Sequence, residues 1–210
     1  GLKFGNVTLS NTAKLDGGGG GETVIPGEIL TTRGKALGSP SGDPRSSGGG
    51  RIFIKAGRLV MDHSAIYHTT EADGHGGKID LQLSEDLTAQ NGSQIVATAL
   101  GSGEGGNVTI EADRLTLSDR SFVESSTADG GGRAGAVLVS ARRIEVLGGS
   151  QIGSDSFNSG DTGDLRLNVS ELLVESLGSP LETGISTTSW LGEGKAGNVK
   201  VEAVGKIEIL

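Results

Sequence analysis

A serine followed two residues later by an aliphatic residue recurs along this chain at intervals of 28 or 29 residues. The serines are Ser64, Ser93, Ser121 and Ser150, and the aliphatic residues are Ile66, Ile95, Val123 and Ile152. A fixed period of this length predicts an array of equivalent units, each packed against its neighbours, and argues against a single globular core. Any function therefore has to be sought on the array.

Each unit also carries two blocks in which apolar and polar residues alternate. The first block follows a glycine, as in Gly-Lys-Ile-Asp-Leu at 77–81 and Gly-Asn-Val-Thr-Ile at 106–110. The second block comes five residues later, as in Leu115 and Leu117. Such alternation is typical of half-buried β-strands, and no stretch has convincing helical spacing. The sequence thus predicts three short strands and a glycine-rich turn per unit.

Strand pairing has to occur between units, because nothing within a unit forms a hairpin. Stacking of like strands on like predicts an all-β fold, a parallel β-solenoid of about six to seven rungs of roughly 28 residues. One rung buries too few aliphatic side chains to offset the entropy of ordering its backbone. We therefore expect residues 1–210 to form one continuous domain.

The ends and the irregular stretches are interpreted from the same alignment. Residues 7–15 align with 115–123, and residues 207–210 with the second strand of a unit, so the chain is expected to be a segment cut in mid-rung from a longer protein. Residues 16–50 are interpreted as either an irregular segment or a divergent rung. Residues 176–182 lengthen one unit and are predicted to form a surface loop.

Charge and composition exclude several kinds of partner. The formal net charge is −8, and the pair Arg142 and Arg143 is too small to make a basic face, so we expect it to be solvated. Neither a nucleic-acid partner nor an anionic membrane is therefore predicted. No apolar run reaches the length of a membrane span, so no membrane insertion is predicted. Cysteine is absent, which leaves both the cytosol and export open.

No catalytic, cofactor-binding or metal site is predicted. His63 and His68 lie near His75 and two aspartates, Asp62 and Asp73, but an odd separation aims the first two histidines at opposite faces of a strand. Exposed surface histidines are the simpler interpretation. Acidic residues recur in the turns and offer oxygen ligands to calcium, although their variable offsets favour solvated charges. They are Asp73, Glu104, Asp129, Asp161 and Glu193.

Three further patterns bear on binding. A column of mostly hydroxyl-bearing residues follows the serine ladder, and hydrogen bonding from rung to rung is favoured over an ice-binding face, which needs two threonine columns. The column is Thr69, Thr98, Ser126, Asp155 and Thr188. Tyr67 and Trp190 are predicted either to stack on sugar rings or to fill gaps at a corner. Residues 101–106 match GxGxxG, but a strand follows them, which indicates a turn.

The whole repeat resembles a known class of protein. Its pattern is Gly-Asn-Val-x-Ile/Val, then x-Leu-x-Leu, then Ser-x-Ile and a glycine-rich turn, and it is clearest in residues 106–132. This pattern, over residues 50–210, resembles the filamentous-haemagglutinin-like exoproteins of two-partner secretion. The resemblance implies a single-stranded right-handed parallel β-helix and export by an outer-membrane transporter. It also implies a place outside a Gram-negative-type bacterium or on its outer-membrane surface.

Two functions are compatible with these patterns. The first is a structural and adhesive stalk without enzymatic turnover, whose partner is a host-cell, glycan or other surface ligand. The alternative is a carbohydrate-active β-helix, either a polysaccharide lyase or hydrolase or a non-catalytic glycan-binding module. Turnover of an acidic polysaccharide would need carboxylates and basic residues on one face of neighbouring rungs. Open rungs would also allow end-to-end contacts.

Overall fold

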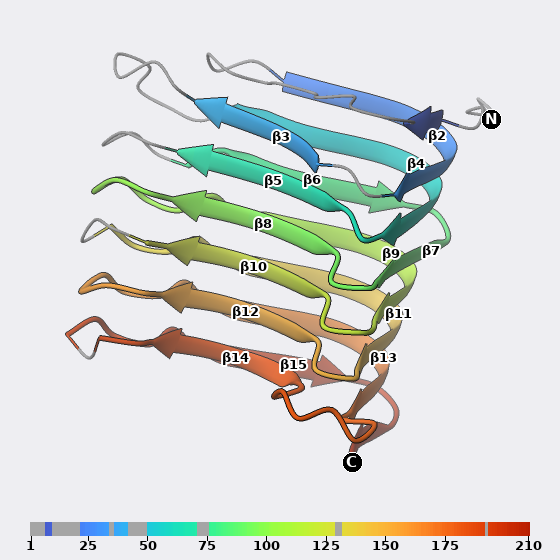
Figure 1. Cartoon of the computed structure of the whole chain (residues 1–210). Helices are drawn as coiled ribbons and strands as arrows, with labels where there is room; N and C mark the ends of the chain where they lie inside the picture. Colours follow the sequence, from blue (N-terminus) through green and yellow to red (C-terminus); the bar gives the residue numbers. More distant parts are fainter. Residues whose placement is uncertain are drawn as a thin grey trace.

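The strands of this chain are stacked like the rungs of a ladder (Figure 1). The computed structural model describes the backbone of residues 7–9, 22–33, 36–41, 50–70, 76–128, 132–191 and 193–210, and within these ranges the side chains from residue 50 onward. Every strand pair is parallel, and these ranges contain no helix. The predicted all-β parallel β-solenoid is thereby confirmed.

Two sheets follow the axis of the stack in the described part of the chain. The ten-stranded sheet contains β1 (Val7–Leu9), β2 (Glu22–Arg33), β4 (Arg51–Asp62), β6 (Lys78–Leu83), β7 (Asp86–Gln90), β9 (Val108–Leu117), β11 (Val137–Leu147), β13 (Leu165–Glu175), β15 (Val199–Ala203) and β16 (Ile207–Ile209). The six-stranded sheet contains β3 (Ala36–Ser41), β5 (Ala65–Thr70), β8 (Gln94–Ala99), β10 (Phe122–Thr127), β12 (Gln151–Ser156) and β14 (Gly184–Ser189).

Most rungs have one long and one short strand, where the sequence predicted three short ones. In β9, Ile110 and Leu115 are buried while the residues between them are exposed or half-buried, so the strand turns a corner there. Pairing continues across the corner, since Ala112 and Arg114 are in register with residues of β11. Pairing with the neighbouring rung thus joins the two blocks into one strand. The pattern along a single rung does not reveal this.

The stack has about five turns with a spacing of about 29 residues. Ile66 pairs with Ile95, and Val123 with Ile152, at the interval that the serine ladder predicted. Ile152 then pairs with Ile185, 33 positions later, because residues 176–182 lengthen the connection between β13 and β14. The insertion lengthens only this connection, and the pairing of both sheets continues across it.

The strands before residue 50 belong to the same stacks. Val7 of β1 pairs with Leu30 of β2, and Leu30 pairs with Leu59 of β4. Leu59 pairs in turn with Leu87, and Leu87 with Leu115, so this register agrees with the alignment of residues 7–9 with 115–117. β3 pairs along its length with β5. Within residues 16–50, β2 and β3 therefore supply the two strands of a rung.

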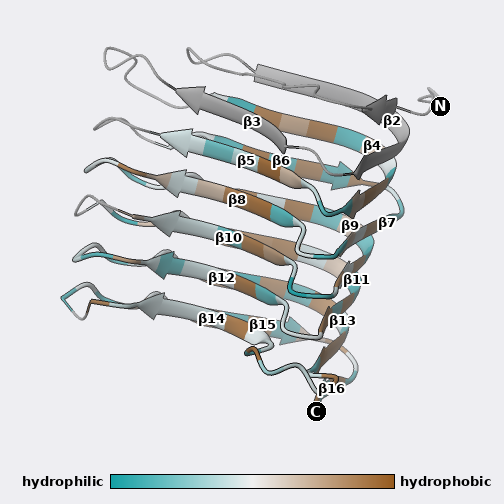
Figure 2. Ribbon diagram, viewed as in Figure 1, coloured by the Kyte–Doolittle hydropathy of each residue, from teal (hydrophilic) through white to brown (hydrophobic). Residues whose placement is uncertain are grey.

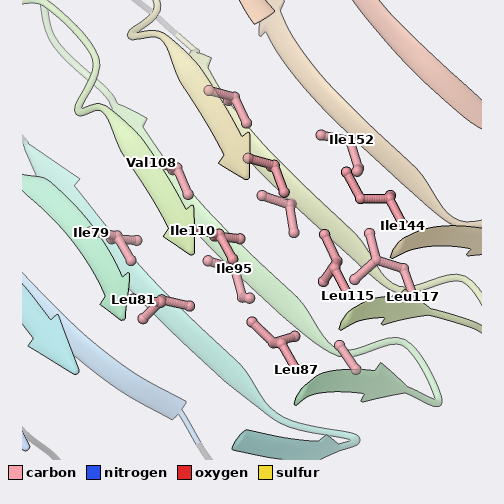
Figure 3. Close-up of a cluster of buried hydrophobic side chains, with 14 of the residues drawn as sticks. Ile79, Leu81, Leu87, Ile95, Val108, Ile110, Leu115, Leu117, Ile144 and Ile152 are labelled. Atoms are coloured by element: carbon pink, nitrogen blue, oxygen red, sulfur yellow. The ribbon is translucent and has the colours of Figure 1, made fainter. Parts of the chain in front are cut away.

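The core is a column of aliphatic side chains enclosed by the two sheets (Figure 3). Inward residues such as Ile79, Val108 and Val137 repeat from rung to rung, each with no exposed surface. Apolar residues accordingly alternate with polar ones along the strands (Figure 2). Each buried aliphatic side chain contributes about 1.5–3 kcal/mol.

A column of glycines allows successive rungs to approach at one corner. A Cβ on Gly106 would lie 2.0 Å from the carbonyl oxygen of Gly77, and one on Gly135 would lie 2.3 Å from that of Gly106. Gly163 and Gly197 meet the preceding glycine of the column in the same way. The glycine that starts each repeat is therefore required by close backbone contact between rungs.

The serines of the repeat form hydrogen bonds from rung to rung. The backbone N–H of Ser64 donates to Ser93 Oγ at 3.2 Å, and that of Ser93 donates to Ser121 Oγ at 3.0 Å. The N–H of Ser121 donates to Ser150 Oγ at 3.2 Å. All four serines are buried. The hydroxyls of Ser93, Ser121 and Ser150 thus each satisfy a buried backbone donor of the preceding rung.

Removing one of these hydroxyls should destabilise the stack. In Ser121→Ala, the buried N–H of Ser93 loses its acceptor, and we expect the free energy of unfolding to fall by about 1–2 kcal/mol. Urea denaturation followed by circular dichroism measures the change. Ser118→Ala is the control, because its exposed hydroxyl bonds only the adjacent Asp119. An equal effect of the two substitutions would refute the role assigned to the ladder.

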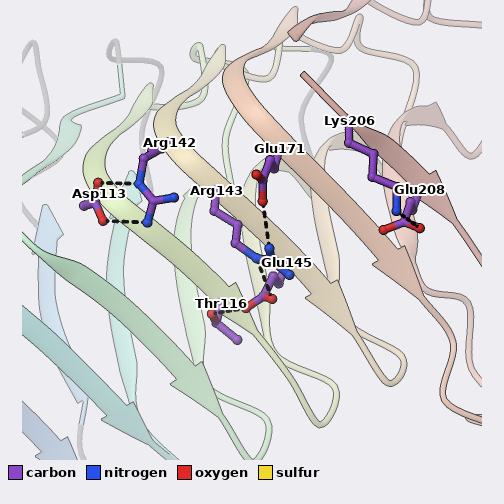
Figure 4. Close-up of polar contacts among 8 residues, drawn as sticks. All are labelled: Asp113, Thr116, Arg142, Arg143, Glu145, Glu171, Lys206 and Glu208. Carbon is purple, nitrogen blue, oxygen red and sulfur yellow. Dashed lines mark hydrogen bonds and ion pairs between the residues drawn. The ribbon is translucent and has the colours of Figure 1, made fainter. Parts of the chain in front are cut away.

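The long strands carry ion pairs on their outer surface (Figure 4). The guanidinium of Arg142 donates to both carboxylate oxygens of Asp113 at 3.1 Å. Arg143 reaches Glu145 at 2.8 Å and Glu171 at 2.7 Å. The two arginines, expected to be simply solvated, are instead paired across rungs, because parallel stacking brings opposite charges into the same column.

Candidate binding surface

The outer face of β10, β12 and β14 gathers chemical groups that the sequence leaves far apart. Ile152 and Ser154 face the core, so alternation along β12 directs Gly153 and Asp155 to the opposite side, where both are still buried; the next residue on that side, Phe157, is exposed. The register places Glu124 of β10 beside Gly153, and Thr188 of β14 beside Asp155. We call this surface the acidic-aromatic face and define it as Glu124, Ser126, Gly153, Asp155, Phe157, Thr188 and Trp190.

Two stacked aromatic rings form one end of the face. The centroids of Phe157 and Trp190 are 6.2 Å apart, and the ring planes are within 5° of parallel. The two side chains remain 45% and 60% exposed, respectively. The N–H of Phe157 donates to Thr127 O at 2.9 Å and that of Trp190 to Ser156 O at 2.8 Å. Because the ladder of backbone hydrogen bonds includes both residues, the pair is held in place by the sheet.

Trp190 is therefore exposed, as its predicted role in stacking requires, and it lies just beyond β14. Its partner Phe157 was missed by sequence reasoning. The signal was present, since Phe157 and Trp190 each stand five residues after the aliphatic residue of the serine ladder or its equivalent Ile185. Tyr67 is half-buried on β5, in register with Val96, and is not part of this cluster.

Two carboxyl groups, those of Glu124 and Asp155, lie on the same face as the ring pair. Desolvation by burial and the nearby charge of Asp155 raise the pKa of Glu124 to about 7, although a hydrogen bond from Ser126 opposes the shift. Burial also raises the pKa of Asp155, which accepts a hydrogen bond from the N–H of Thr188 at 3.1 Å. The strands β8, β10, β12 and β14 contain no lysine or arginine. The charge of the pair is thus uncompensated by its own sheet.

Gly153 is buried in the middle of the face, between Glu124 and Ser186. A Cβ there would meet only ordinary contacts, at 3.4 Å from the carbonyl oxygen of Ser186 and 3.6 Å from Asp155 Oδ2. Unlike the glycines at the corner, this one is not required by rung stacking. The half-exposed Glu124 and the exposed rings of Phe157 and Trp190 are the parts of the face most open to a ligand, which suits a polar ligand with apolar patches.

The predicted hydroxyl column is present and crosses this face. Thr69, Thr98, Ser126, Asp155 and Thr188 are in register from rung to rung. The hydroxyls of Thr98 and Ser126 are 3.0 Å apart and hydrogen-bonded. This agrees with the interpretation that the hydroxyls bond from rung to rung.

The histidines are not brought together into a site. His63 is exposed, with its Nδ1 3.2 Å from Asn91 O, whereas His68 is fully buried, and neither of its ring nitrogens has a hydrogen-bond partner. The prediction of opposite faces is confirmed, but the interpretation of His68 as a surface residue is wrong. Its ring fits inside because Gly77 has no side chain there, and a Cβ would lie 2.3 Å from Nε2. His75 and Asp73 lie outside the described residues.

The burial of His68 predicts a dependence of stability on pH. Desolvation lowers the pKa of His68 below the ordinary value of 6.5. As the pH falls below about 6.5, the unfolded chain binds a proton that the folded chain excludes, so stability is lost until the pH reaches the folded-state pKa. We expect His68→Ala to remove this contribution, whatever its effect on stability at pH 8. An unchanged slope of unfolding free energy between pH 6.5 and 5.5 would contradict the prediction.

The acidic turn residues do not form a calcium ladder. Backbone hydrogen bonds place Glu104, Arg133, Asp161 and Lys195 in one column, so basic residues separate the acidic ones. Asp73 and Asp129 fall in stretches that the structure leaves undescribed, and Glu193 is exposed. Among the described side chains, no group of three or more acidic, histidine or cysteine residues could hold a metal ion.

A hollow of about 270 Å³ lies at the glycine corner. Lys78, Glu104, Arg133 and Asp164 line it together with the glycine column. Its glycines are explained by contact between rungs, so they give no sign of a ligand. Gly105 and Gly106 of the GxGxxG match belong to this corner and lead into β9, which confirms a turn and excludes the strand-to-helix geometry of a dinucleotide site.

Comparisons of this chain with protein-family models, curated proteins and solved structures found no match. The fold and its surfaces therefore define the class of protein, a parallel β-solenoid with an acidic-aromatic face. The resemblance to haemagglutinin-like exoproteins rests on the repeat pattern alone. In the ranges that the structure describes, there is no helix with the length and apolar character of a membrane span.

Proposed function

We propose that this chain is a rigid segment of a structural and adhesive stalk, within a secreted or cell-surface bacterial exoprotein of the haemagglutinin-like kind. The observation that carries the proposal is the uninterrupted register of both sheets. Each rung is hydrogen-bonded to the next by its backbone, and the serine ladder adds bonds at one corner. A column joined in this way resists bending and extends in proportion to its number of rungs.

The place and partners belong to the same proposal. Export through an outer-membrane transporter would set the stalk on the outside of a Gram-negative-type bacterium, and the absence of cysteine is compatible with that route. The ligand would be a host-cell, glycan or other surface molecule. We expect neither nucleic-acid binding nor membrane insertion, because the net charge of −8 repels both kinds of anionic partner. We expect no enzymatic turnover.

Adhesion is tested with beads coated with the purified chain. Coated beads should remain on epithelial cells or on a glycan-coated surface under flow. Control beads carry the same density of an unrelated protein of similar net charge. Retention no greater than that of the control beads on every surface would refute the adhesive role.

A second candidate function is that of a carbohydrate-active β-helix. The observation in its favour is Glu124, whose pKa of about 7 suits a general acid, with Asp155 as a neighbouring carboxylate. An acidic polysaccharide is a poor substrate for this face, since its strands carry no basic residue. Release of reducing ends from neutral polysaccharides, abolished in Glu124→Gln, would establish turnover.

End-to-end association of copies is a further part of the proposed stalk. The side chains of Val199, Ile207 and Ile209 in β15 and β16 are 45–75% exposed although they continue the inward-facing columns. We propose that this apolar rung packs on another copy of the chain. Light scattering should then show a mass that rises with concentration, and Ile209→Lys should keep the chain monomeric. A monomer at millimolar concentration would rule out this contact.

A further inference from the structure

We propose that the acidic-aromatic face binds a glycan whose sugar rings carry a protonated amine. The inference rests on the proposed adhesive function and names the ligand class. It follows from two independent features of the face, the exposed ring pair and the uncompensated carboxylates. An amino sugar is the ligand chemistry that satisfies both.

The rings call for a ligand with flat apolar surfaces. Phe157 and Trp190 are the exposed aromatic pair of a sheet whose other outward residues are mostly polar, and the backbone ladder holds both in place. Sugar rings present C–H groups on their faces and hydroxyls around their edges. The faces pack on the aromatic rings, and the hydroxyls meet the polar groups of Thr188 and Asp155 on the same surface.

The carboxylates select the charge of the ligand. Glu124 and Asp155 are partly buried, they repel one another, and no basic residue lies on their strands. A uronic acid would add to this repulsion, and a neutral sugar would leave it unchanged. An ammonium group beside Glu124, the half-exposed member of the pair, would offset the charge that the two carboxylates share.

A sugar fits this surface better than a basic peptide. The backbone of β12 is paired with β10 on one side and β14 on the other along its whole length. The centre of the face therefore offers side chains only, whereas extended peptides commonly bind by adding to an open sheet edge such as that of β14. A ring with hydroxyls on every side makes its hydrogen bonds to side chains alone.

The only tryptophan of the chain lies in the site and reports binding directly. Trp190 fluorescence is titrated with a glucosamine hexamer, an N-acetylglucosamine hexamer and a galacturonate hexamer in 150 mM salt. We expect the glucosamine hexamer to bind at least tenfold more tightly than the acetylated one, and the galacturonate hexamer not to bind. Phe157→Ala should weaken binding about tenfold, because it removes one of the two exposed rings.

Matched variants separate the site from general charge attraction. Glu124→Gln and Asp155→Asn should remove the preference for the amine, while Glu111→Gln, which changes the net charge equally on an exposed residue of β9, should retain it. Leu191→Ala, which removes an exposed apolar side chain next to Trp190, should bind like the unaltered chain. Circular dichroism checks that each variant is folded.

Several results would overturn the inference. These are equal binding of the acetylated and free amino sugars, binding of galacturonate, or a lysine hexamer that displaces the glucosamine hexamer at equal concentration. Bead adhesion distinguishes the two proposals. Adhesion that survives without glycan binding refutes only the glycan site, and glycan binding without adhesion of beads to any surface refutes only the adhesive stalk.

Discussion

The Gly135→Ala variant is expected to unfold with a free energy about 3 kcal/mol lower than that of the unaltered chain. The added Cβ would lie 2.3 Å from the carbonyl oxygen of Gly106 and 2.8 Å from that of Gly105. Both atoms belong to the backbone of the preceding rung, so relief requires that the rungs separate. Separation would weaken the hydrogen bonds between β9 and β11. Thermal and urea unfolding followed by circular dichroism measure the loss.

Gly184→Ala is the matched control for this substitution. A Cβ on Gly184, at the start of β14, would meet no atom within 4 Å, and the backbone there is not left-handed. The control should therefore be neutral or slightly stabilising, because alanine reduces the entropy of the unfolded chain. Similar unfolding of the two variants would show that the glycine corner does not depend on close contact. Because solenoids depart from two-state behaviour, limited proteolysis should be compared as well.

The second large effect is expected from Glu124→Gln, and it depends on pH. The folded chain raises the pKa of Glu124 from 4.5 to about 7. Folding therefore favours the protonated side chain, and its contribution to stability is complete below pH 4.5 and lost as the pH rises through 7. At pH 8, where Glu124 is charged in both states, the neutral glutamine should make the chain more stable by about 2–3 kcal/mol. At pH 4 the two chains should be equally stable.

Urea denaturation at both pH values tests this prediction. Glu111→Gln removes the same charge from an exposed position of β9 and should have little effect at either pH. A Glu124→Gln chain that is no more stable than the unaltered one at pH 8 would show that the carboxylate is already compensated. If the amino-sugar proposal is right, saturating glucosamine hexamer should stabilise the unaltered chain and narrow the difference between the two proteins.

The loss of stability caused by the charged Glu124 side chain bears on the candidate site. The other buried polar side chains at this height of the stack are bonded, as Ser125 is to the backbone of Gly106 and Gly135. Glu124 and Asp155 accept hydrogen bonds from Ser126 and Thr188, yet they also repel one another in a partly desolvated place. Groups that reduce stability in this way are concentrated at functional sites, where a ligand supplies the missing interaction.

Much of the fold was accessible from the period of the sequence. The serine interval gave the register of β5, β8, β10 and β12, and the glycine blocks gave the start of the long strands. The joining of two blocks into β9 was not predicted, since it depends on hydrogen bonds from neighbouring rungs. The burial of His68 was missed for a similar reason. Its ring fills space that is free only because Gly77, just before β6, has no side chain.

The candidate site was only partly accessible. Trp190 was recognised as a possible sugar-stacking residue, but its contact with Phe157 joins positions 33 residues apart in the one unit whose length departs from the period. The opposition of Glu124 and Asp155 likewise crosses from one rung to the next. For the acidic turn residues the sequence favoured solvated charges over a calcium ladder, and the register places Arg133 and Lys195 between them.

The sequence by itself determined that this protein is a column of repeated parallel strands, because a period near 29 residues with alternating aliphatic side chains can bury its apolar face only by stacking. Only the tertiary structure decided which side chains face one another across rungs, since that depends on register and on the added length at residues 176–182. Local alternation selects the inner and outer faces of a strand. The charge and the ring contacts of the acidic-aromatic face arise between strands of different rungs, so they cannot be read from any single repeat.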